Sequence, residues 1–583
     1  MWTASSSSAT TAISDAHYSY DSRGYLSVVE TVTRDGAAVD SNPSLSGNQP
    51  ESSTYFYDVL GRVDRIELPN LVEDCTYTTM GNVLQVAQFI PDGDNTDLTD
   101  NLPVAKYDYT YRLDGIRDSA IETFRFDNDD NPETPSVAET TSYAWAYDQA
   151  GRLTRESIDS FDDSLDRTET FTLDLVGNRV RHVTDLASTP DIVDQVVTSV
   201  YDSNDRLVTE LRDDGGNGTI DQTTTYDWGI DVSDPDGGSQ QLGVLEKNGD
   251  GVTTSRQTMT YNLQGQLAAV VQESFDGSGD VTGRTRVGYQ YDFAGIRSVA
   301  IEATDTDLNG TFSSTEITGS TEYLTDFQSL TGLPQTLVET TKNAEGETTR
   351  RVTYVFGIDE LTQTASDLDP STGDVTSSET LTFGHDAHGS VRALIDATAG
   401  ITQAYFYTAY GELLAVLNGS GEVVSSDAAD ALTSLLYSGE SFDSRINQQY
   451  LRARWYQPGT GRFSSFDPFP GNLDSPFSFN RYAYTSGNPI QFGDPTGNFE
   501  GLIGLIGAMA GSSNGRAEDA AASANVWMSA RRAQKLIEFV QKMVELSINI
   551  QRLAAGDVFG VITSLIGVEP REITSDIERL NFK

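Results

Sequence analysis

Hydrophobic and polar residues alternate along most of the chain, in short runs that are interrupted by a recurring turn. The clearest copies of this turn are YDVLGRV at 57–63 and YDQAGRL at 147–153, with further copies at 20–26 and 291–297. Weaker copies occur at 77–83, 111–117, 173–180, 201–207 and 261–267. Alternation with a period of two predicts half-buried strands, and a turn between two such runs predicts a β-hairpin. We therefore expect a mainly β protein built from repeated antiparallel hairpins.

Each residue type in the repeated turn has a physical role. The aspartate can accept hydrogen bonds from the turn backbone, and the glycine supplies a positive φ that side chains disfavour. A two-stranded hairpin is only marginally stable in water, so successive hairpins are expected to pair edge to edge. Tyrosines at equivalent positions would then stack in a ladder and bury apolar area.

The alternating pattern stops at Asn498. The segment 499–583 carries 9 Lys or Arg and 10 Asp or Glu, whereas the 498 residues before it carry 29 and 77. Apolar residues at intervals of three or four predict a helix with one apolar side, formed by Leu536, Phe539, Met543, Leu546, Ile550 and Leu553. We expect a small α-helical C-terminal tail, either a bundle or a plug, with membrane insertion as the alternative. Its apolar runs at 501–511 and 556–568 are each too short to span a bilayer.

Charge narrows the choice of partners. The 583 residues carry a formal net charge of −49 at pH 7, which argues against nucleic acid or an anionic membrane as the partner of the main body. Divalent cations and basic partners suit such a surface better.

Cys75 is the only cysteine, so the chain can form no internal disulfide. The first 25 residues lack the basic and apolar regions of a cleaved signal peptide, and no segment is apolar enough for a transmembrane span.

An acidic loop at 305–316 has the spacing of an EF-hand calcium loop. Residues that offer oxygen atoms stand at loop positions one, three, five and nine, with glycine at position six and glutamate at position twelve. The predicted calcium ligands are Asp305, Asp307, Asn309, Thr311 and Glu316. Asp, Asn and Gly also form ordinary turns, and the flanks of the loop have the pattern of strands rather than helices. A calcium site and a plain turn therefore both stay open.

The most specific signal lies between 383 and 498. This stretch contains HGSVRAL at 388–394, YTAYGELL at 407–414, YSGESFDSRINQQYLRARWYQPGTGRF at 437–463, and two Asp-Pro turns at Asp467 and Asp494. These blocks and the upstream YD turns closely resemble the RHS (rearrangement hotspot) repeat proteins, which include bacterial polymorphic toxins and the C component of insecticidal Tc toxins. The resemblance implies a YD-repeat β-shell at 1–380, an RHS repeat-associated core at 381–498 and a variable C-terminal segment at 499–583. It also implies that the hairpin ribbon spirals into a partial or closed hollow shell.

The same resemblance gives the paired aspartates a role. In toxin-type members, the core cuts its own backbone just after the second DP-x-G motif by an aspartic-protease-like mechanism and releases the C-terminal segment. Asp467 and Asp494 match the two motif aspartates, Arg462 is a basic residue near the first, and the implied cut lies near Asn498. Such chemistry needs two carboxylates close enough to share one proton. In the alternative, which the departures from the family pattern at Phe466 and Asn498 favour, both turns only shape the closing end of the shell.

These features support three functional hypotheses. The first is an RHS-type shell protein that encloses or presents its own C-terminal segment as cargo, as part of a toxin-delivery system. The second is an extracellular or surface adhesion protein whose acidic surface and calcium loops contact protein or carbohydrate at a cell surface. The third is a remnant RHS protein that lacks its delivery module. We expect a secreted or cell-surface protein without a recognisable signal peptide in this chain. The tail alone cannot form a histidine- or cysteine-based enzyme site, because all four histidines and the cysteine precede it.

Overall fold

Antiparallel β-structure dominates the first of two compact units into which the chain divides. The computed structural model describes residues 14–34, 37–38, 52–91, 103–126, 138–186, 193–229, 238–327, 329–469, 471, 476–498 and 501–502. The two units are Met1–Ser513 and Asn514–Lys583, and every described residue belongs to the first. Within that unit, strands β1–β30 form one sheet. The prediction of a mainly β fold built from antiparallel hairpins is confirmed.

The sheet begins with strands β1 (Ser14–Tyr20), β2 (Leu26–Arg34), β3 (Ala37–Ala38), β4 (Ser52–Tyr57), β5 (Val63–Glu67), β6 (Val72–Tyr77), β7 (Val83–Phe89), β8 (Pro103–Tyr111), β9 (Arg117–Arg125) and β10 (Ala138–Tyr147). It continues with β11 (Leu153–Asp159), β12 (Arg167–Leu173), β13 (Arg179–Leu186), β14 (Gln195–Tyr201), β15 (Leu207–Asp214), β16 (Gln222–Asp227), β17 (Gly243–Asn248), β18 (Thr253–Tyr261), β19 (Leu267–Phe275) and β20 (Val281–Tyr291). It ends with β21 (Arg297–Thr304), the 3₁₀ turn η1 (Ser314–Glu316), β22 (Ile317–Asp326), β23 (Gln335–Asn343), β24 (Thr348–Phe356), β25 (Glu360–Leu368), β26 (Val375–His385), β27 (Val391–Ile395), β28 (Ile401–Tyr407), β29 (Leu413–Asn418) and β30 (Val423–Ser425).

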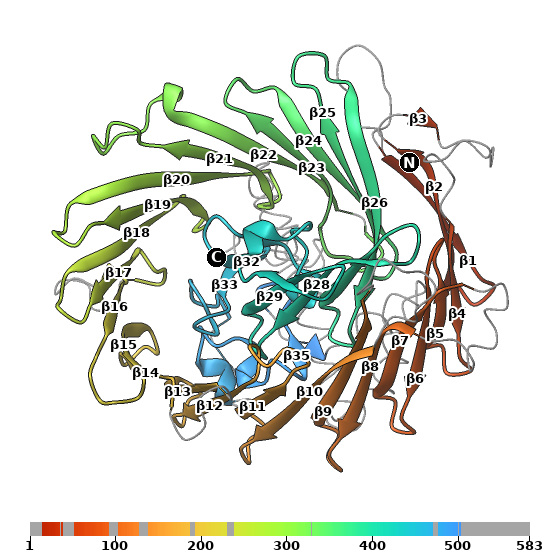
Figure 1. The fold of residues 1–583 in the computed structure, drawn as a ribbon, viewed down its shortest axis with the longest axis horizontal. Coiled ribbons are helices and arrows are strands. Elements are labelled where there is room, and N and C mark those ends of the chain that lie inside the picture. The colour runs from red at the N-terminus through yellow and green to blue at the C-terminus, as the bar shows by residue number, and fades with distance from the viewer. Residues whose placement is uncertain are drawn as a thin grey trace, which may run out of the picture. The chain divides into compact units, whose positions relative to one another are not determined.

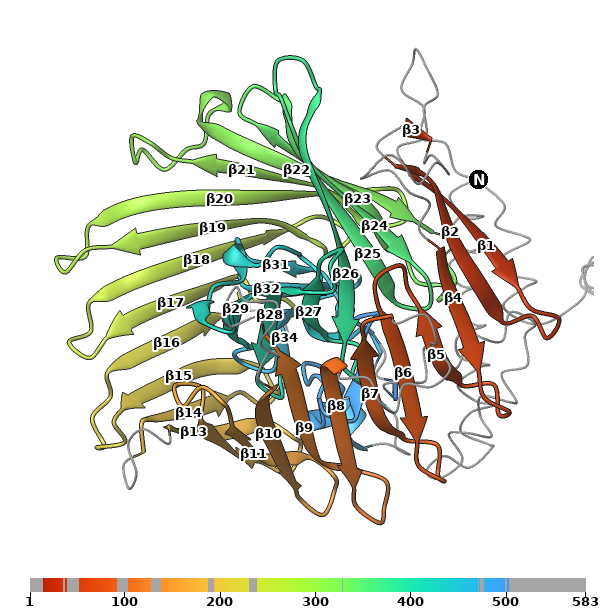
Figure 2. The same cartoon turned by 45° about the vertical axis from the view of Figure 1, so that its right-hand side comes forward.

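Strands pair in the order in which they occur along the chain. β1 pairs with β2, β2 pairs with both β3 and β4, and every later strand to β30 is antiparallel to the one before it. The resulting ribbon curves around the strands from β27 onwards, which Figures 1 and 2 both show on the inner side of the curve. Hairpins thus pair with their neighbours along the chain, and the ribbon that they form surrounds this inner segment.

The repeated turn has the hydrogen bonds that its sequence predicts. In the copy at 57–63, Asp58 Oδ1 accepts hydrogen bonds from the backbone N–H groups of Leu60 and Arg62, at 2.8 and 3.0 Å. Gly61 has a φ of +81°, and a Cβ atom there would lie 2.5 Å from the hydroxyl oxygen of Tyr25. The position therefore requires glycine for both its conformation and its close contact.

The turn tyrosines join each hairpin to the one before it. The tyrosine hydroxyl donates a hydrogen bond to a backbone carbonyl of the preceding hairpin. The pairs are Tyr57 to Leu26, Tyr77 to Val63, Tyr111 to Val83, Tyr147 to Arg117, Tyr201 to Arg179 and Tyr291 to Leu267. Among the described residues, no ring contact joins one turn tyrosine to the next, so the expected ladder is not observed. Tyr57 instead contacts Tyr25 of the preceding repeat, with ring centres 5.0 Å apart.

The first and last parts of the ribbon lie side by side. The Tyr18 hydroxyl donates to the carbonyl of Phe356 at 3.1 Å, and Gln88 Nε2 donates to the carbonyl of His385 at 3.1 Å. Apolar side chains from the early strands and from β25–β29 also share one buried cluster. The sheet therefore bends far enough for segments about 300 residues apart to pack together.

After β30 the chain leaves the large sheet. It forms η2 (Ala428–Asp430), η3 (Tyr437–Gly439) and a four-stranded sheet of β31 (Phe442–Asp443), β32 (Gln448–Leu451), β33 (Arg454–Gln457) and β34 (Arg462–Phe463). η4 (Pro476–Phe479), η5 (Thr485–Gly487) and the paired strands β35 (Phe492–Gly493) and β36 (Gly501–Leu502) follow. The expected boundary between 380 and 381 falls inside β26, because the large sheet continues through the start of the core.

The predicted tail helix over 536–553 lies outside the described residues. Within the described ranges, no helix is long and apolar enough to cross a membrane.

Candidate functional site

Two aspartates from separate loops meet at one buried arginine. Asp467 follows β34, Asp494 follows β35, and Arg454 is the first residue of β33. Nη2 of Arg454 lies 3.1 Å from Oδ2 of Asp467 and 3.2 Å from Oδ2 of Asp494. The structure therefore brings together the two aspartates that the sequence analysis selected, on a cation that it did not select.

Packing holds the Arg454 side chain in place. Its guanidinium carbon lies 3.6 Å from the centre of the Phe463 ring, and its Nη1 donates to the carbonyl of Arg481 at 3.1 Å. Arg454 is only 5% exposed, and Asp494 is 4% exposed. A planar guanidinium can bond several acceptors at once, which suits it to join three loops.

Burial and charge act in opposite directions on these groups. Burial lowers the pKa of Arg454 and, although both aspartates raise it, the pKa stays below its ordinary value. Burial also raises the pKa of Asp467; Arg454 opposes this rise, and Asp494 adds to it. Arg481 also opposes the rise in the pKa of Asp467. Burial and the charge of Asp494 therefore favour the protonated form of Asp467, and the two arginines favour its ionised form.

The backbone just after Asp494 is clamped by two arginines. Arg454 Nε donates a hydrogen bond to the carbonyl of Gly497, and Arg452 Nη1 donates to the carbonyl of Pro495. Gly497 has a φ of +69°, and a Cβ atom there would lie 2.2 Å from the carbonyl oxygen of Leu451. Glycine at 497 thus allows the chain to pass directly over the β32–β33 hairpin.

Thr496 links Asp494 to the next peptide group. Its hydroxyl donates to Asp494 Oδ1 at 3.0 Å, and the backbone N–H of Asn498 donates to Thr496 Oγ1 at 3.1 Å. The peptide group between Gly497 and Asn498 is therefore hydrogen-bonded at both ends, through its carbonyl to Arg454 and through its N–H to Thr496.

Arg462, the predicted basic partner of the aspartates, has a different position. Its Nη1 donates to Asn178 Oδ1 at 2.9 Å, and its guanidinium carbon lies 4.8 Å from the centre of the Tyr201 ring. Arg462 thus fastens the core to the repeat ribbon. Its nearness to Asp467 in sequence did not indicate nearness in space, because β34 directs this side chain toward the ribbon.

Arg454 and Thr496 were not selected from the sequence. In LRARWYQ at 451–457, Arg452 and Ala453 form the turn between β32 and β33, and Arg454 begins β33. Because Arg454 stands between the apolar residues Ala453 and Trp455, alternation assigns it to the polar side and does not indicate that it is buried. Thr496 offered no signal either, since threonine is an ordinary turn residue.

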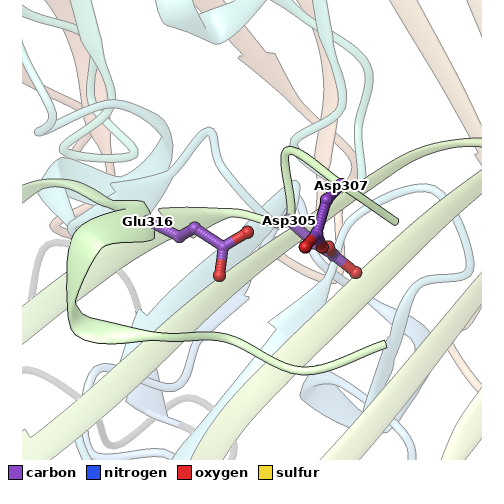
Figure 3. Close-up of side chains that lie close together, drawn as sticks. All are labelled: Asp305, Asp307 and Glu316. Atoms are coloured by element: carbon purple, nitrogen blue, oxygen red, sulfur yellow. The ribbon is translucent and has the colours of Figure 1, made fainter. Parts of the chain in front are cut away.

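The predicted calcium loop gathers its carboxylates in one place. Carboxylate oxygens of Asp305, Asp307 and Glu316 lie within 4.8 Å of one another (Figure 3). A cation from the protein already touches this group, since Arg284 Nη1 lies 2.5 Å from Asp305 Oδ2. Hard oxygen donors at this spacing are the type that calcium prefers.

The loop also bonds to itself. Glu316 accepts hydrogen bonds from the backbone N–H groups of Thr306 and Ser313, at 2.9 and 2.8 Å. The other two predicted ligands contact each other, with the Thr311 N–H donating to Asn309 Oδ1 at 2.8 Å. Backbone N–H groups and an arginine of the chain therefore already bond several oxygen atoms of the loop.

The relatives found by comparison with known proteins are much longer than this chain. No protein-family model matches it. Over 258 residues it is 27% identical to the tRNA3(Ser)-specific nuclease WapA of Bacillus spizizenii, a match to 44% of this chain and 9% of that protein. Over 150 residues it is 30% identical to Salivary gland surface protein 1 of Aedes aegypti, a match to 25% of this chain and 4% of that protein. The chain therefore spans less than a tenth of either relative.

Among solved structures, the crystal structure of TcdB2-TccC3-Cdc42 aligns with 85% of this chain and 24% of its own chain. The alignment has 15% sequence identity and a TM-score of 0.42.

Proposed function

The chain is an RHS/YD-repeat protein with an RHS repeat-associated core, and from this premise we propose that the core cuts its own backbone beside Gly497 and releases the C-terminal segment as cargo. The repeat ribbon would enclose or present that segment until it is released. Such a protein would act after secretion or at a cell surface, as part of a toxin-delivery system.

One observation carries this proposal. Asp467 and Asp494 contact the same guanidinium nitrogen of Arg454, and another nitrogen of that guanidinium holds the carbonyl of Gly497. Two carboxyl groups that share one proton are the chemical requirement of aspartic-type peptide hydrolysis. Here both carboxylates contact the arginine that bonds the Gly497 carbonyl, which supports this peptide group as the substrate.

The arrangement supplies the main parts of peptide hydrolysis. An ionised carboxylate can take a proton from water as the water oxygen attacks the carbonyl carbon. The Arg454 guanidinium can stabilise the negative charge that develops on the carbonyl oxygen, and burial strengthens this effect. Because the carboxyl groups, the arginine and the peptide bond belong to one folded chain, the reaction needs water but no encounter between two protein molecules.

The test is to express the full chain and to follow it by intact mass spectrometry. We expect the wild-type chain to yield two fragments, with the smaller one beginning close to Asn498. Asp494→Asn should leave the chain intact, since amide replaces the proton-accepting carboxylate. Asp292→Asn is the control for loss of a turn carboxylate outside the core, where Asp292 Oδ1 accepts a hydrogen bond from the Ala294 N–H at 2.8 Å.

The charge of the tail also supports a cargo role. Residues 499–583 carry 9 Lys or Arg and 10 Asp or Glu, in contrast to the strongly acidic chain before them. A near-neutral segment avoids repulsion by acidic surroundings. Expression of 499–583 alone in a bacterial host would test whether the released segment is toxic.

A second candidate function, calcium-dependent adhesion, is favoured by the loop at 305–316. Three of its carboxylates lie within 4.8 Å of one another, as a cation site requires. If calcium binds there, millimolar calcium should raise the melting temperature of the chain, and Glu316→Gln should remove that rise. An unchanged melting temperature would assign the loop to ordinary turns.

A further inference from the structure

We propose that a cavity between the ribbon and the core binds one small monovalent anion, of the size of chloride. The cavity lies between the turn that joins β12 to β13 and the core segments 460–462 and 483–487. Arg179, the first residue of β13, and Arg462, the first residue of β34, both line it. The cavity contains neither the two aspartates nor the loop at 305–316, so the proposal depends on neither self-cleavage nor calcium.

Both arginines are buried positive charges that contact no carboxylate. Arg179 is 8% exposed and Arg462 is 5% exposed. Among the described residues, neither guanidinium lies within 4.0 Å of a carboxylate oxygen. By contrast, the similarly buried Arg392 pairs with Glu122, and Arg454 pairs with the two aspartates. A buried charge is costly unless an opposite charge pairs with it, so an anion beside Arg179 and Arg462 would stabilise the fold.

The acceptors that these two arginines contact are neutral. Arg179 Nη2 donates to the carbonyl of Gly459 at 2.5 Å. Arg462 Nη1 donates to Asn178 Oδ1 at 2.9 Å. The carboxylate of Asp205 accepts instead from Asn178 Nδ2 at 2.8 Å, and its charge acts on Arg462 from beyond ion-pair distance. Neutral acceptors bond N–H groups without cancelling the positive charge, and each guanidinium has five N–H groups to share.

Aromatic rings fix both guanidinium groups beside the cavity. The guanidinium carbon of Arg179 lies 5.4 Å from the centre of the Tyr410 ring. That of Arg462 lies 4.8 Å from the centre of the Tyr201 ring. Tyr410 itself lines the cavity, and a Cβ atom at Gly461 would lie 2.9 Å from this ring. Because these charged groups are already held in place, they lose little conformational entropy when a ligand binds.

The size of the cavity determines the kind of anion. Its volume of about 20 Å³ exceeds the roughly 10–15 Å³ that one water molecule requires, and leaves no room for an ion of several heavy atoms. A halide ion fits this space, whereas a phosphate group or an organic carboxylate does not. Guanidinium groups are weakly hydrated, so they exchange water for such an ion at low cost. The bound halide would join the ribbon, through Arg179, to the core, through Arg462.

The first test locates the anion in the wild-type chain. Crystals of the full chain are grown in sodium bromide and measured at the bromine absorption edge, where bromide scatters anomalously. We expect an anomalous peak in the cavity, in contact with guanidinium nitrogen atoms of Arg179 and Arg462. A cavity without this peak, filled by water alone, would overturn the proposal.

The second test measures whether the anion stabilises the fold. The melting temperature of the full chain is compared in sodium chloride and in sodium gluconate at equal ionic strength, so that charge screening is the same. Gluconate is too large for the cavity, and we expect chloride to raise the melting temperature by about 2–3 °C. Arg179→Met should abolish this rise, because it removes one of the two charges and leaves no carboxylate unpaired.

Arg62→Met is the matched control. Arg62 is a ribbon arginine whose guanidinium pairs with Asp58 at 2.5 Å, so its loss should leave the effect of chloride unchanged. Equal melting temperatures of the wild-type chain in the two salts would contradict the anion site. A chloride effect that persists in Arg179→Met would assign the anion to another part of the chain and equally reject this cavity.

Discussion

The repeat ribbon is characterised by hydrogen bonds that recur in each turn, whereas the core brings two aspartates to one buried arginine. In the ribbon, turn aspartates accept from backbone N–H groups and turn tyrosines donate to backbone carbonyls, as Asp58 and Tyr57 do. In the core, buried ionised groups bond to one another. Arg454 binds two aspartates there, and Arg297 reaches from the ribbon to the core residue Asp443 at 3.1 Å.

The two arrangements differ in how they respond to substitution. Hydrogen bonds to the backbone are modest and repeated in each hairpin, so each can be lost with limited effect. A buried charge is costly unless it is paired, and its proton can move. The buried charges around Arg454 are therefore expected to be the most sensitive to single substitutions.

The largest contrast should come from removing an arginine in each region. Arg454→Met leaves two aspartates without their cation in a buried site, and we expect it to lower the free energy of unfolding by about 3–5 kcal/mol. In the ribbon, Arg23 pairs with Asp21 at 2.8 Å, but its side chain is 50% exposed. Arg23→Met should therefore cost at most about 1 kcal/mol. Urea denaturation measures both values.

Neutralising the aspartates sharpens this test. In a chain that already carries Asp467→Asn and Asp494→Asn, Arg454→Met should cost much less, because no unpaired carboxylates remain. If Arg454→Met lowers the free energy of unfolding by the same amount in that double variant as in the wild type, packing on Phe463 rather than charge explains the role of Arg454.

The next effect is a dependence on pH that centres on His385, the last residue of β26. Burial lowers the pKa of His385, but Glu360, Asp359 and Glu73 outweigh it and raise the pKa to about 9. A raised histidine pKa stabilises the fold fully below the ordinary value of 6.5, and this stability is lost as the pH rises through 9. Burial raises the pKa of Asp359 from 3.8 to about 6. The protonated carboxyl group stabilises the fold at low pH, and this stability is lost as the pH rises from 3.8 through 6.

We therefore expect the free energy of unfolding to fall by about 2–3 kcal/mol between pH 6 and pH 9. His385→Gln should flatten this dependence, whereas the same substitution at the exposed His17 in β1 should leave it unchanged. Urea denaturation at several pH values in this range measures the free energy of unfolding of each chain. A wild-type profile without slope would contradict the assignment of a charged His385.

The smallest effects should come from the ribbon tyrosines. Tyr57→Phe, Tyr111→Phe and Tyr291→Phe each remove one hydroxyl that donates to a neighbouring hairpin. We expect each to cost about 1 kcal/mol. Because the three sites are far apart in the sheet, their effects should add in the triple variant, with no change in slope between pH 6 and pH 9. Strong non-additivity in urea denaturation would show that the ribbon does not respond hairpin by hairpin.

Most of the fold could be predicted from the sequence, because its interactions are local. Asp58 and Gly61 lie within one turn, and each hairpin pairs with the next along the chain. The pairing of Asp467 with Asp494 was also predicted, but only through the family resemblance of their motifs. The interactions that build the site join residues distant in sequence, and no pattern of period two specifies them.

Tertiary structure decided which arginine serves which partner. Arg462 turns toward Asn178 in the ribbon, and Arg454 takes the place between the two aspartates. Both arginines lie in neighbouring strands of one small sheet, so distance along the chain could not separate them. The direction of each side chain from its strand, together with the need of a buried carboxylate for a cation, made the choice.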